Sequence, residues 1–345
     1  MHSSWIGRVG DELQTARLGG KLLWNMARQR PFLCNWQITY RCNLRCGICS
    51  FWRQPQSARE ELSLDQLRVV ADRLRPHAPL MISMAGGEPL LRPDLPDIAR
   101  LLGRDHWFTL ITNGWLLTRD LAERLYDAGM RDIHVSLDYA DPDRHDAQRG
   151  QKGAFARAVT ALQLLHDLRP DRRHRVHIMA VLIDDNVDQL EGLILLAEEL
   201  GVSFELSLYS HRRGEKPLRY PTRPVAEYLG ELKRRHPCFV SYEDYLASFD
   251  RAVAEDGMPA CRAGTTFFNI DHRGRVARCI DTNDRPSGSL LERPLDELLA
   301  DLRTQAADDP CSRCWTSCRG FADVVAGPAG FAKTAPDLLQ VIRPL

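Results

Sequence analysis

The chain has 345 residues with 46 basic and 46 acidic side chains, so its formal net charge is zero, and 44% of its residues are hydrophobic. This balance gives no electrostatic reason to expect nucleic acid as a partner, and no apolar run is long enough to span a bilayer. Ten cysteines without a secretory signal indicate a reducing compartment, the cytoplasm, and favour metal ligation over disulfides.

The first 30 residues are predicted to form a helical extension. Basic side chains alternate there with apolar ones such as Trp5, Leu22 and Trp24. Such a helix commonly packs beneath the rest of the fold. It could instead lie on a membrane surface and give the protein a peripheral lipid contact.

Three cysteines follow the first predicted strand. The β-rich run from Asn35 to Tyr40 leads into Cys42, Cys46 and Cys49. Three thiolates within eight residues can bind three irons of a [4Fe–4S] cluster and leave the fourth iron open. A zinc knuckle would need a paired C-x₂-C and a fourth ligand nearby. The pattern therefore favours an iron–sulfur cluster on a loop that leaves a strand, where α/β barrels keep their reactive groups.

Helices and strands then alternate along the chain. The predicted helices cover residues 64–74, 95–102, 120–128, 154–168 and 187–200, and the predicted strands cover 80–84, 107–111, 132–136, 176–182 and 204–208. Together with the first strand they form six βα units, which predicts a parallel sheet with helical crossovers.

The stretch from Ile38 to Cys49 resembles the signature of the radical S-adenosylmethionine (radical SAM) superfamily. The resemblance implies an α/β fold, a partial (βα)₆ TIM-like barrel with an open side. It also implies that SAM chelates the open iron of the cluster held by Cys42, Cys46 and Cys49. One electron, supplied by a reductase, flavodoxin or ferredoxin, then cleaves SAM, and the 5′-deoxyadenosyl radical abstracts hydrogen from a substrate.

Further motifs at the strand ends resemble those of the same family. Ala85-Gly86-Gly87-Glu88-Pro89 resembles a motif that holds the SAM amino group, with glycines that let the backbone approach a ligand. Arg149, in His145-Asp146-Ala147-Gln148-Arg149-Gly150, suits a carboxylate because its planar group donates two parallel hydrogen bonds. The residues that the resemblance places at SAM or beside it are Tyr40, Ile48, Gly86, Gly87, Glu88, Asn113, Ser136, Asp138, Arg149, Met179 and Asn186.

Several of these residues have specific expected roles. Asn113 and Asn186 are expected near the ribose, and Ser136 near the ribose or the SAM carboxylate. Asp138 is expected on the substrate side. Met179 is expected either at the adenine or in the hydrophobic core.

A second group of cysteines lies near the C-terminus. Cys261 and Cys279 flank a predicted hairpin around Gly274, and Cys311, Cys314 and Cys318 follow a predicted helix over residues 295–302. A structural zinc site would fit this spacing almost as well. The spacing also resembles the SPASM/twitch extension of radical SAM enzymes, which implies one auxiliary [4Fe–4S] cluster. Four thiolates would close that cluster and leave one cysteine spare, whereas three would leave an iron open.

The predicted organisation has five parts. They are a helical extension (1–30), a radical SAM core (31–225), a helical linker (226–260), a small Cys-rich SPASM/twitch-like domain (261–325) and a tail (326–345). The predicted substrate is a peptide or protein side chain that is oxidised or cross-linked. The alternatives are a small molecule or lipid, such as a sugar, a tetrapyrrole or an isoprenoid, and a non-catalytic iron–sulfur or zinc scaffold.

Overall fold

Six parallel strands form the centre of the molecule. The computed structural model describes residues 18–53, 57–211, 216–254, 258–312, 314–326, 329–330 and 332–334. The strands are β1 (Leu33–Thr39), β2 (Met81–Gly86), β3 (Trp107–Thr112), β4 (Asp132–Ser136), β5 (Arg175–Leu182) and β6 (Ser203–Leu208). They lie side by side in chain order, each parallel to the next. The predicted parallel sheet of six βα units is confirmed.

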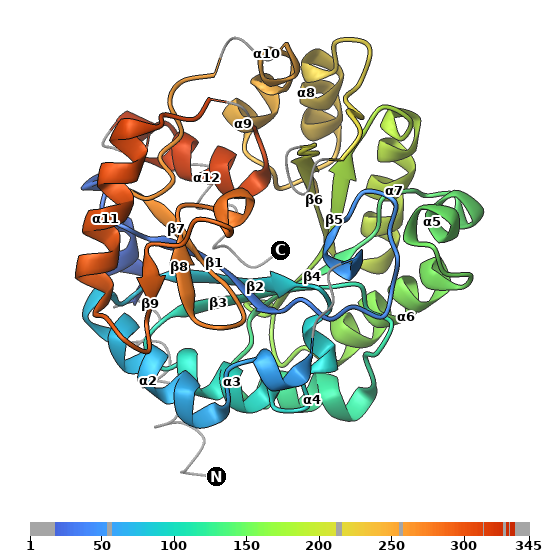
Figure 1. Cartoon of the computed structure of the whole chain (residues 1–345). Helices are drawn as coiled ribbons and strands as arrows, with labels where there is room; N and C mark the ends of the chain where they lie inside the picture. Colours follow the sequence, from blue (N-terminus) through green and yellow to red (C-terminus); the bar gives the residue numbers. More distant parts are fainter. Residues whose placement is uncertain are drawn as a thin grey trace.

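Helices surround the strands on the outside of the barrel (Figure 1). They are α2 (Leu64–Leu74), α3 (Leu95–Leu102), α4 (Arg119–Asp127), α5 (Pro142–Arg149), α6 (Ala154–Leu168), α7 (Leu190–Leu200), α8 (Ala226–Arg235), α9 (Glu243–Ala247) and α10 (Phe249–Val253). Short 3₁₀ turns lie at Phe51–Arg53, Ala58–Glu60, Arg75–His77, Pro89–Leu91, Val187–Gln189 and Ile280–Thr282.

Alternate residues of each strand face opposite sides of the sheet. Ile82, Leu110 and Ile133 are fully buried in the main hydrophobic core. Their neighbours Ser83 and His134 instead line a cavity inside the barrel. The core therefore lies between the strands and the outer helices, and the interior of the barrel is more polar.

Local signals set several helix ends. Ser63 and Gln66 cap the start of α2 reciprocally, because each side chain accepts a hydrogen bond from the other's backbone N–H. The helix α5 begins after Asp141 with Pro142 in its first turn and ends at Gly150, whose φ is +66°. The helix α5 was not predicted from the sequence, because its residues are almost all polar and show no helical hydrophobic period.

The Cys-rich region extends the same sheet. Strand β7 (Phe267–Ile270) pairs in parallel with β1, and β8 (Arg275–Ala277) and β9 (Gly288–Ser289) follow in antiparallel order. The region continues with α11 (Leu295–Asp308), which runs past its predicted end at residue 302, and α12 (Ser317–Val325). It is therefore joined to the barrel through β1, while the domain boundaries given above remain predictions.

The described part of the N-terminal extension packs against the barrel. Residues 18–27 are helical, and Leu22 and Met26 are buried in a cluster with Phe32, Phe267 and Val325. Residues 1–17 and most of the predicted tail lie outside the described residues, and membrane contact stays a prediction. No helix in the described part of the chain has the length and hydrophobicity needed to cross a membrane.

Candidate active site

A cavity of about 490 Å³ runs through the interior of the barrel. At one end it is lined by Leu22 and Met26 of the N-terminal helix, and at the other by Cys42, Cys46 and Cys49. Sites for small molecules typically measure about 300–1,000 Å³. The predicted cysteine triplet therefore faces a space large enough for a cofactor.

The end of α5 holds the cysteine loop. The backbone N–H groups of Arg45 and Gly47 donate to the carbonyl oxygens of Arg149 and Gln148, at 3.3 and 2.9 Å. A Cβ at Gly150 would lie 2.8 Å from the carbonyl oxygen of Arg45, so only glycine allows this close approach. The motif that contains Arg149 and Gly150 thus positions the loop that carries the thiols.

Arg149 connects the loop to a buried carboxylate. Its Nη2 lies 2.7 Å from Asp138 Oδ2, and its Nη1 lies 3.9 Å from Cys46 Sγ. Asp138 is fully buried, and its Oδ1 accepts from Val181 N at 3.0 Å. The expected carboxylate partner of Arg149 is thus Asp138 of the protein itself, and the cation is placed beside a cluster thiol.

Burial disfavours the thiolate forms of Cys42 and Cys46. Burial raises the pKa of Cys42 to about 12. Burial also raises the pKa of Cys46, although Arg149 partly offsets the rise. Because iron binds the thiolate, cluster assembly must displace these protons, and a nearby guanidinium helps to offset the negative charge that results.

Gly86 and Gly87 are required by the protein's own backbone. A Cβ at Gly86 would lie 2.1 Å from the carbonyl oxygen of Thr39, and one at Gly87 would lie 2.0 Å from that of Arg41. Gly87 N donates to the same Thr39 oxygen at 2.8 Å. The two glycines therefore let the end of β2 lie against the end of β1, from which the cysteine loop departs.

Glu88 is buried with one acceptor position to spare. Its Oε1 accepts from Leu90 N at 3.0 Å and from Thr112 Oγ1 at 2.6 Å, and its Oε2 accepts from Asn113 N at 2.8 Å. A carboxylate offers about four acceptor positions, so one remains for a cation such as an ammonium group. Burial raises the pKa of Glu88 despite these hydrogen bonds.

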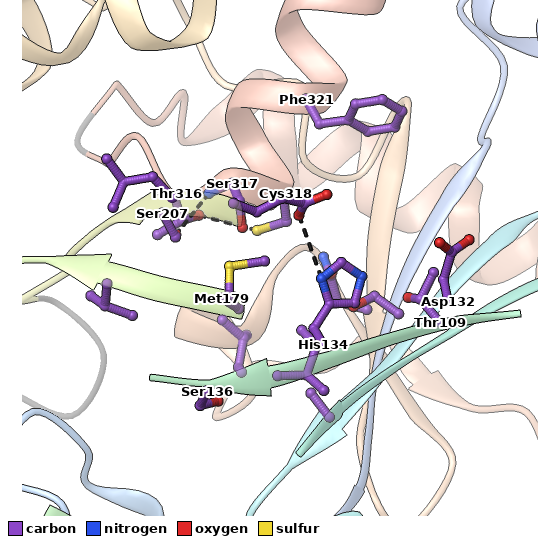
Figure 2. Close-up of a pocket in the computed structure, with 18 of the residues that line it drawn as sticks. Thr109, Asp132, His134, Ser136, Met179, Ser207, Thr316, Ser317, Cys318 and Phe321 are labelled. Atoms are coloured by element: carbon purple, nitrogen blue, oxygen red, sulfur yellow. Dashed lines mark hydrogen bonds and ion pairs between the residues drawn. The ribbon is translucent and has the colours of Figure 1, made fainter. Parts of the chain in front are cut away.

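The residues predicted to lie at SAM or beside it fall into two groups. Those that line the cavity are Ile48, Gly86, Gly87, Glu88, Asn113, Ser136, Arg149 and Met179. Those placed behind its wall are Tyr40, Asp138 and Asn186, which the described lining does not include. Figure 2 shows Met179 projecting from β5 into the cavity.

Asn186 and Tyr40 have structural partners in the fold. Asn186 is fully buried, and its Nδ2 donates to the carbonyl oxygens of Asp138 and Val181, both at 2.9 Å. Tyr40 stacks on Phe51 with ring centroids 4.9 Å apart. These contacts position the loops that follow β1, β4 and β5, and a direct contact of either residue with SAM remains a prediction.

Four of the five C-terminal thiols influence one another electrostatically. Burial raises the pKa of Cys279 and Cys314 to about 12, and Cys314 adds to the rise in the pKa of both Cys261 and Cys279. Cys318 adds to the rise at Cys314, and Cys318 also lines the cavity at the start of α12 (Figure 2). Cys311 contributes its backbone oxygen, which accepts from Cys261 N at 2.6 Å.

Arg319 supplies a buried cation to this second thiol group. Its side chain is 1% exposed, and its Nη1 donates to the carbonyl oxygen of Cys314 at 2.7 Å. Its charge opposes the effect of burial on the pKa of Cys261. An ion pair with Asp323 at 3.1 Å holds the guanidinium in place. Each of the two thiol groups therefore has an arginine beside it, Arg149 or Arg319.

A polar group inside the barrel was not predicted from the sequence. His134 of β4, His177 of β5 and Glu205 of β6 each offer one ligand atom, and these atoms lie within 4.8 Å of one another. Asp132 and Arg175 lie beside them, 3.0 Å apart. The available signal was polar residues within strands of a parallel sheet, which are ordinarily apolar on both faces.

The comparisons with known proteins agree with this geometry. Residues 36–197 match the Radical SAM superfamily. The mycofactocin maturase MftC of Mycolicibacterium smegmatis is 27% identical over 338 residues, which cover 89% of this chain and 82% of that protein. The AdoMet-dependent heme synthase of Methanosarcina barkeri is 32% identical over 173 residues, half of this chain and 48% of that protein.

Solved structures share the fold. SuiB of Streptococcus suis bound to S-adenosylmethionine superposes with a TM-score of 0.61 at 19% identity, over 80% of this chain and 68% of SuiB. SuiB bound to its precursor peptide SuiA gives a TM-score of 0.60 at 19% identity, over 84% and 69%. With the CxxxCxxC triplet on the loop after β1 and a cavity beneath it, the chain belongs to the radical SAM superfamily.

Proposed function

We propose that this radical SAM enzyme matures a peptide by abstracting hydrogen from one of its side chains. The observation that carries the proposal is the extent of the similarity to MftC, which covers 89% of the chain and so extends beyond the barrel into the Cys-rich region. SuiB, whose fold the chain shares, has been crystallised with a precursor peptide. A single side chain is also what the cavity could admit beside a cofactor.

The residues present fit the cofactors that the family uses. Cys42, Cys46 and Cys49 would hold a [4Fe–4S] cluster, and the spare acceptor position of Glu88 would take the amino group of SAM. When bound, these cofactors supply reductive cleavage of SAM and a 5′-deoxyadenosyl radical. The chain itself orients the thiol loop through α5 and surrounds the reacting space with the walls of the barrel, which limits access of water.

The second group of thiols would hold one auxiliary [4Fe–4S] cluster. Its ligands would be four of the five neighbouring cysteines Cys261, Cys279, Cys311, Cys314 and Cys318. Because Cys318 lines the cavity, an electron from the substrate would have a short path to this cluster. The enzyme would work in the cytoplasm and receive its electrons from a reductase, flavodoxin or ferredoxin.

A tetrapyrrole is the second candidate substrate. It is favoured by the similarity to the heme synthase of Methanosarcina barkeri, which is 32% identical but covers only half of this chain. That match covers half of this chain, whereas the match to MftC covers 89%, so the peptide is the better supported substrate class.

The test compares substrates directly. Anaerobically reconstituted enzyme is incubated with SAM, dithionite and either candidate precursor peptides or a propionate-bearing tetrapyrrole, and products are measured by mass spectrometry. A peptide mass change that depends on SAM is the expected result. Mass change of the tetrapyrrole alone would replace the peptide proposal with the second candidate.

Two matched variants test the assignment of the first cluster. Cys46→Ala should abolish formation of 5′-deoxyadenosine and lower the iron content from about eight to about four per chain. Cys34→Ala is the control, because Cys34 is a fully buried thiol of β1 that belongs to the hydrophobic core. Undiminished SAM cleavage by the Cys46 variant would contradict the assignment of the triplet.

A further inference from the structure

The polar group on the inner wall of the barrel lies away from the cysteine loop. His134 and Glu205 line the same cavity as the thiols, but they stand on the strands β4 and β6 themselves and not on the loops that follow them. Figure 2 shows His134 projecting from its strand into the cavity, and its Nδ1 faces the carboxylate of Glu205. None of the roles described for SAM or the thiols uses these side chains.

The spacing within the group is too long for good hydrogen bonds. His134 Nδ1 lies 3.5 Å from Glu205 Oε2, and His177 Nδ1 lies 3.6 Å from Glu205 Oε1. Hydrogen bonds of this kind measure about 2.7–3.2 Å. Among the described residues neither Nδ1 has a hydrogen-bond partner, although His134 is 8% exposed and His177 1%.

The same spacing suits a shared metal ion. Zinc binds imidazole nitrogen and carboxylate oxygen at about 2.0–2.2 Å, so two ligands of a tetrahedral ion lie about 3.3–3.6 Å apart. Two histidines and one glutamate are also a donor set that catalytic zinc sites use. Since buried polar atoms with no partner are costly, the unpartnered Nδ1 atoms point to a ligand that the two rings share.

A carboxylate behind the group completes the pattern. His177 Nε2 lies 3.3 Å from Asp132 Oδ1, so this ring can donate to Asp132 and leave its Nδ1 as a ligand atom. Asp132 is itself fixed by Arg175 at 3.0 Å and by Trp107 Nε1 at 2.8 Å. Metal-binding histidines usually donate their other ring nitrogen to a carboxylate in this way.

The charges also favour a cation. With neutral imidazoles, Asp132 and Glu205 carry two negative charges against the single positive charge of Arg175. Parallel alignment of β4 and β5 places His134 opposite His177, and the rings stack with centroids 4.5 Å apart. The rings therefore present their nitrogens to the same carboxylate, Glu205.

We propose that His134, His177 and Glu205 bind one zinc-like divalent ion on the inner wall of the barrel. Because His134 and Glu205 line the cavity, the ion would keep an open position toward it. An oxygen of a substrate, such as a carboxylate, could occupy that position. The site stands on its own geometry and does not depend on the proposed peptide activity.

The test measures the binding of zinc to the full chain after its cysteines have been loaded with iron–sulfur clusters. Anaerobically reconstituted protein is freed of loose metal on a chelating resin, and binding of Zn²⁺ is followed by elemental analysis and by zinc X-ray absorption. The expected result is one zinc per chain with nitrogen and oxygen neighbours at about 2.0–2.2 Å. Failure to retain zinc, or zinc with sulfur neighbours alone, would overturn the proposal.

Variants assign the ligands. Glu205→Gln keeps the shape of the side chain and should abolish stoichiometric binding, and Asp132→Asn should weaken it by about 10–100-fold. His236→Asn is the control, because His236 also pairs with a glutamate, Glu198 at 2.9 Å, but outside the cavity lining.

The outcomes remain decisive if one variant is unstable. Iron content and the melting temperature of each variant report whether it has folded. If Glu205→Gln does not fold, the wild-type absorption spectrum and the Asp132 variant still decide the question. Equal zinc binding by wild type and a folded Glu205→Gln protein would refute the proposed ligands.

Discussion

The buried charge of Asp138 positions the cysteine loop through Arg149. The residue was expected beside the substrate, yet its carboxylate is fully buried and binds Arg149, which lies next to Cys46. An ion pair so far from solvent stabilises the fold only while both partners are present, since either charge alone is costly. Asp138 therefore acts through Arg149 to position the cysteine loop.

Replacing Asp138 with Asn should lower the free energy of unfolding by about 3–5 kcal/mol, because Arg149 would lose its buried counter-charge. The melting temperature measured by circular dichroism checks this. Asp97→Asn is the matched control, since the Asp97–Arg100 pair is exposed by 53% and 57% and its loss should cost about 0–1 kcal/mol. Equal shifts for the two variants would contradict the structural role assigned to Asp138.

His106 predicts how stability depends on pH. Burial lowers its pKa to about 4, and its Nδ1 accepts from Leu80 N at 3.1 Å, which requires the neutral ring. The unfolded chain binds a proton there at about pH 6.5. Stability is therefore complete above pH 6.5 and falls as the pH drops toward 4, by about 3 kcal/mol in all.

The variant His106→Asn isolates this effect, because the amide oxygen can still accept from Leu80 but does not titrate. Between pH 7 and pH 5 its melting temperature should fall less than that of the wild type. The difference between the two proteins removes pH effects that they share. Parallel profiles would show that His106 does not bind its proton as argued.

At the scale of elements, the bounds of helices and strands could be predicted from local sequence more fully than the arrangement of the site. The helices 64–74, 95–102 and 154–168 and the strand 132–136 were predicted with the bounds that the structure has. Their hydrophobic periods and flanking turns are local signals. The helices α8, α9, α10 and α12 were not predicted as separate elements.

Contacts between distant strands could not be predicted from local patterns. The pairing of β7 with β1, and the register that brings His134, His177 and Glu205 together, depend on alignment between segments far apart in the chain. Recognisable motifs located the thiols, Glu88 and Arg149. They could not reveal that Asp138 and Asn186 lie behind the cavity wall, because a motif fixes residue type and not the direction of the side chain.

The turn after β2 allows a test of whether the ends of β1 and β2 must lie close together. Gly87→Ala should displace the cysteine loop, because the new Cβ would meet the backbone oxygen of Arg41 at 2.0 Å. We expect loss of stability and at least a tenfold fall in SAM cleavage, measured by chromatography of 5′-deoxyadenosine.

The control for this turn is Gly230→Ala, in the middle of α8. Its Cβ would meet only the flexible end of Arg234 at 3.4 Å, and alanine favours a helix by about 0.5–1 kcal/mol. It should leave SAM cleavage unchanged. A fully active Gly87→Ala enzyme would show that the two strand ends need not lie so close.

For the molecule as a whole, the two thiol groups reach the same cavity but are held in place by different helices and strands. Cys42, Cys46 and Cys49 are held by α5 and by the ends of β1 and β2, whereas Cys318 reaches the cavity from α12. The barrel and the Cys-rich region thus surround the same cavity, and damage to the thiols of one region need not disturb the thiols of the other.

The double variant Cys279→Ala, Cys314→Ala should keep measurable 5′-deoxyadenosine formation and stop product formation. The thiols that it removes lie outside the described lining of the cavity, beyond the Cys318 side of the wall. Chromatography and product mass spectrometry on the same sample give both readings. Loss of SAM cleavage in a folded variant that retains the first cluster would show that the two regions are not separable.

The pairing of β7 with β1 also has a consequence for how the chain folds during synthesis. Leu33, at the start of β1, finds its neighbour Phe267 only after the chain has been made as far as β7. Until then β1 has an unpaired edge, and such edges invite association with other chains. Pairing over so long a stretch is also slow. Insertion of iron into the loop after β1 would therefore carry the lowest risk of such association once β7 has paired with that edge, so that a segment made much later completes the support of the first site.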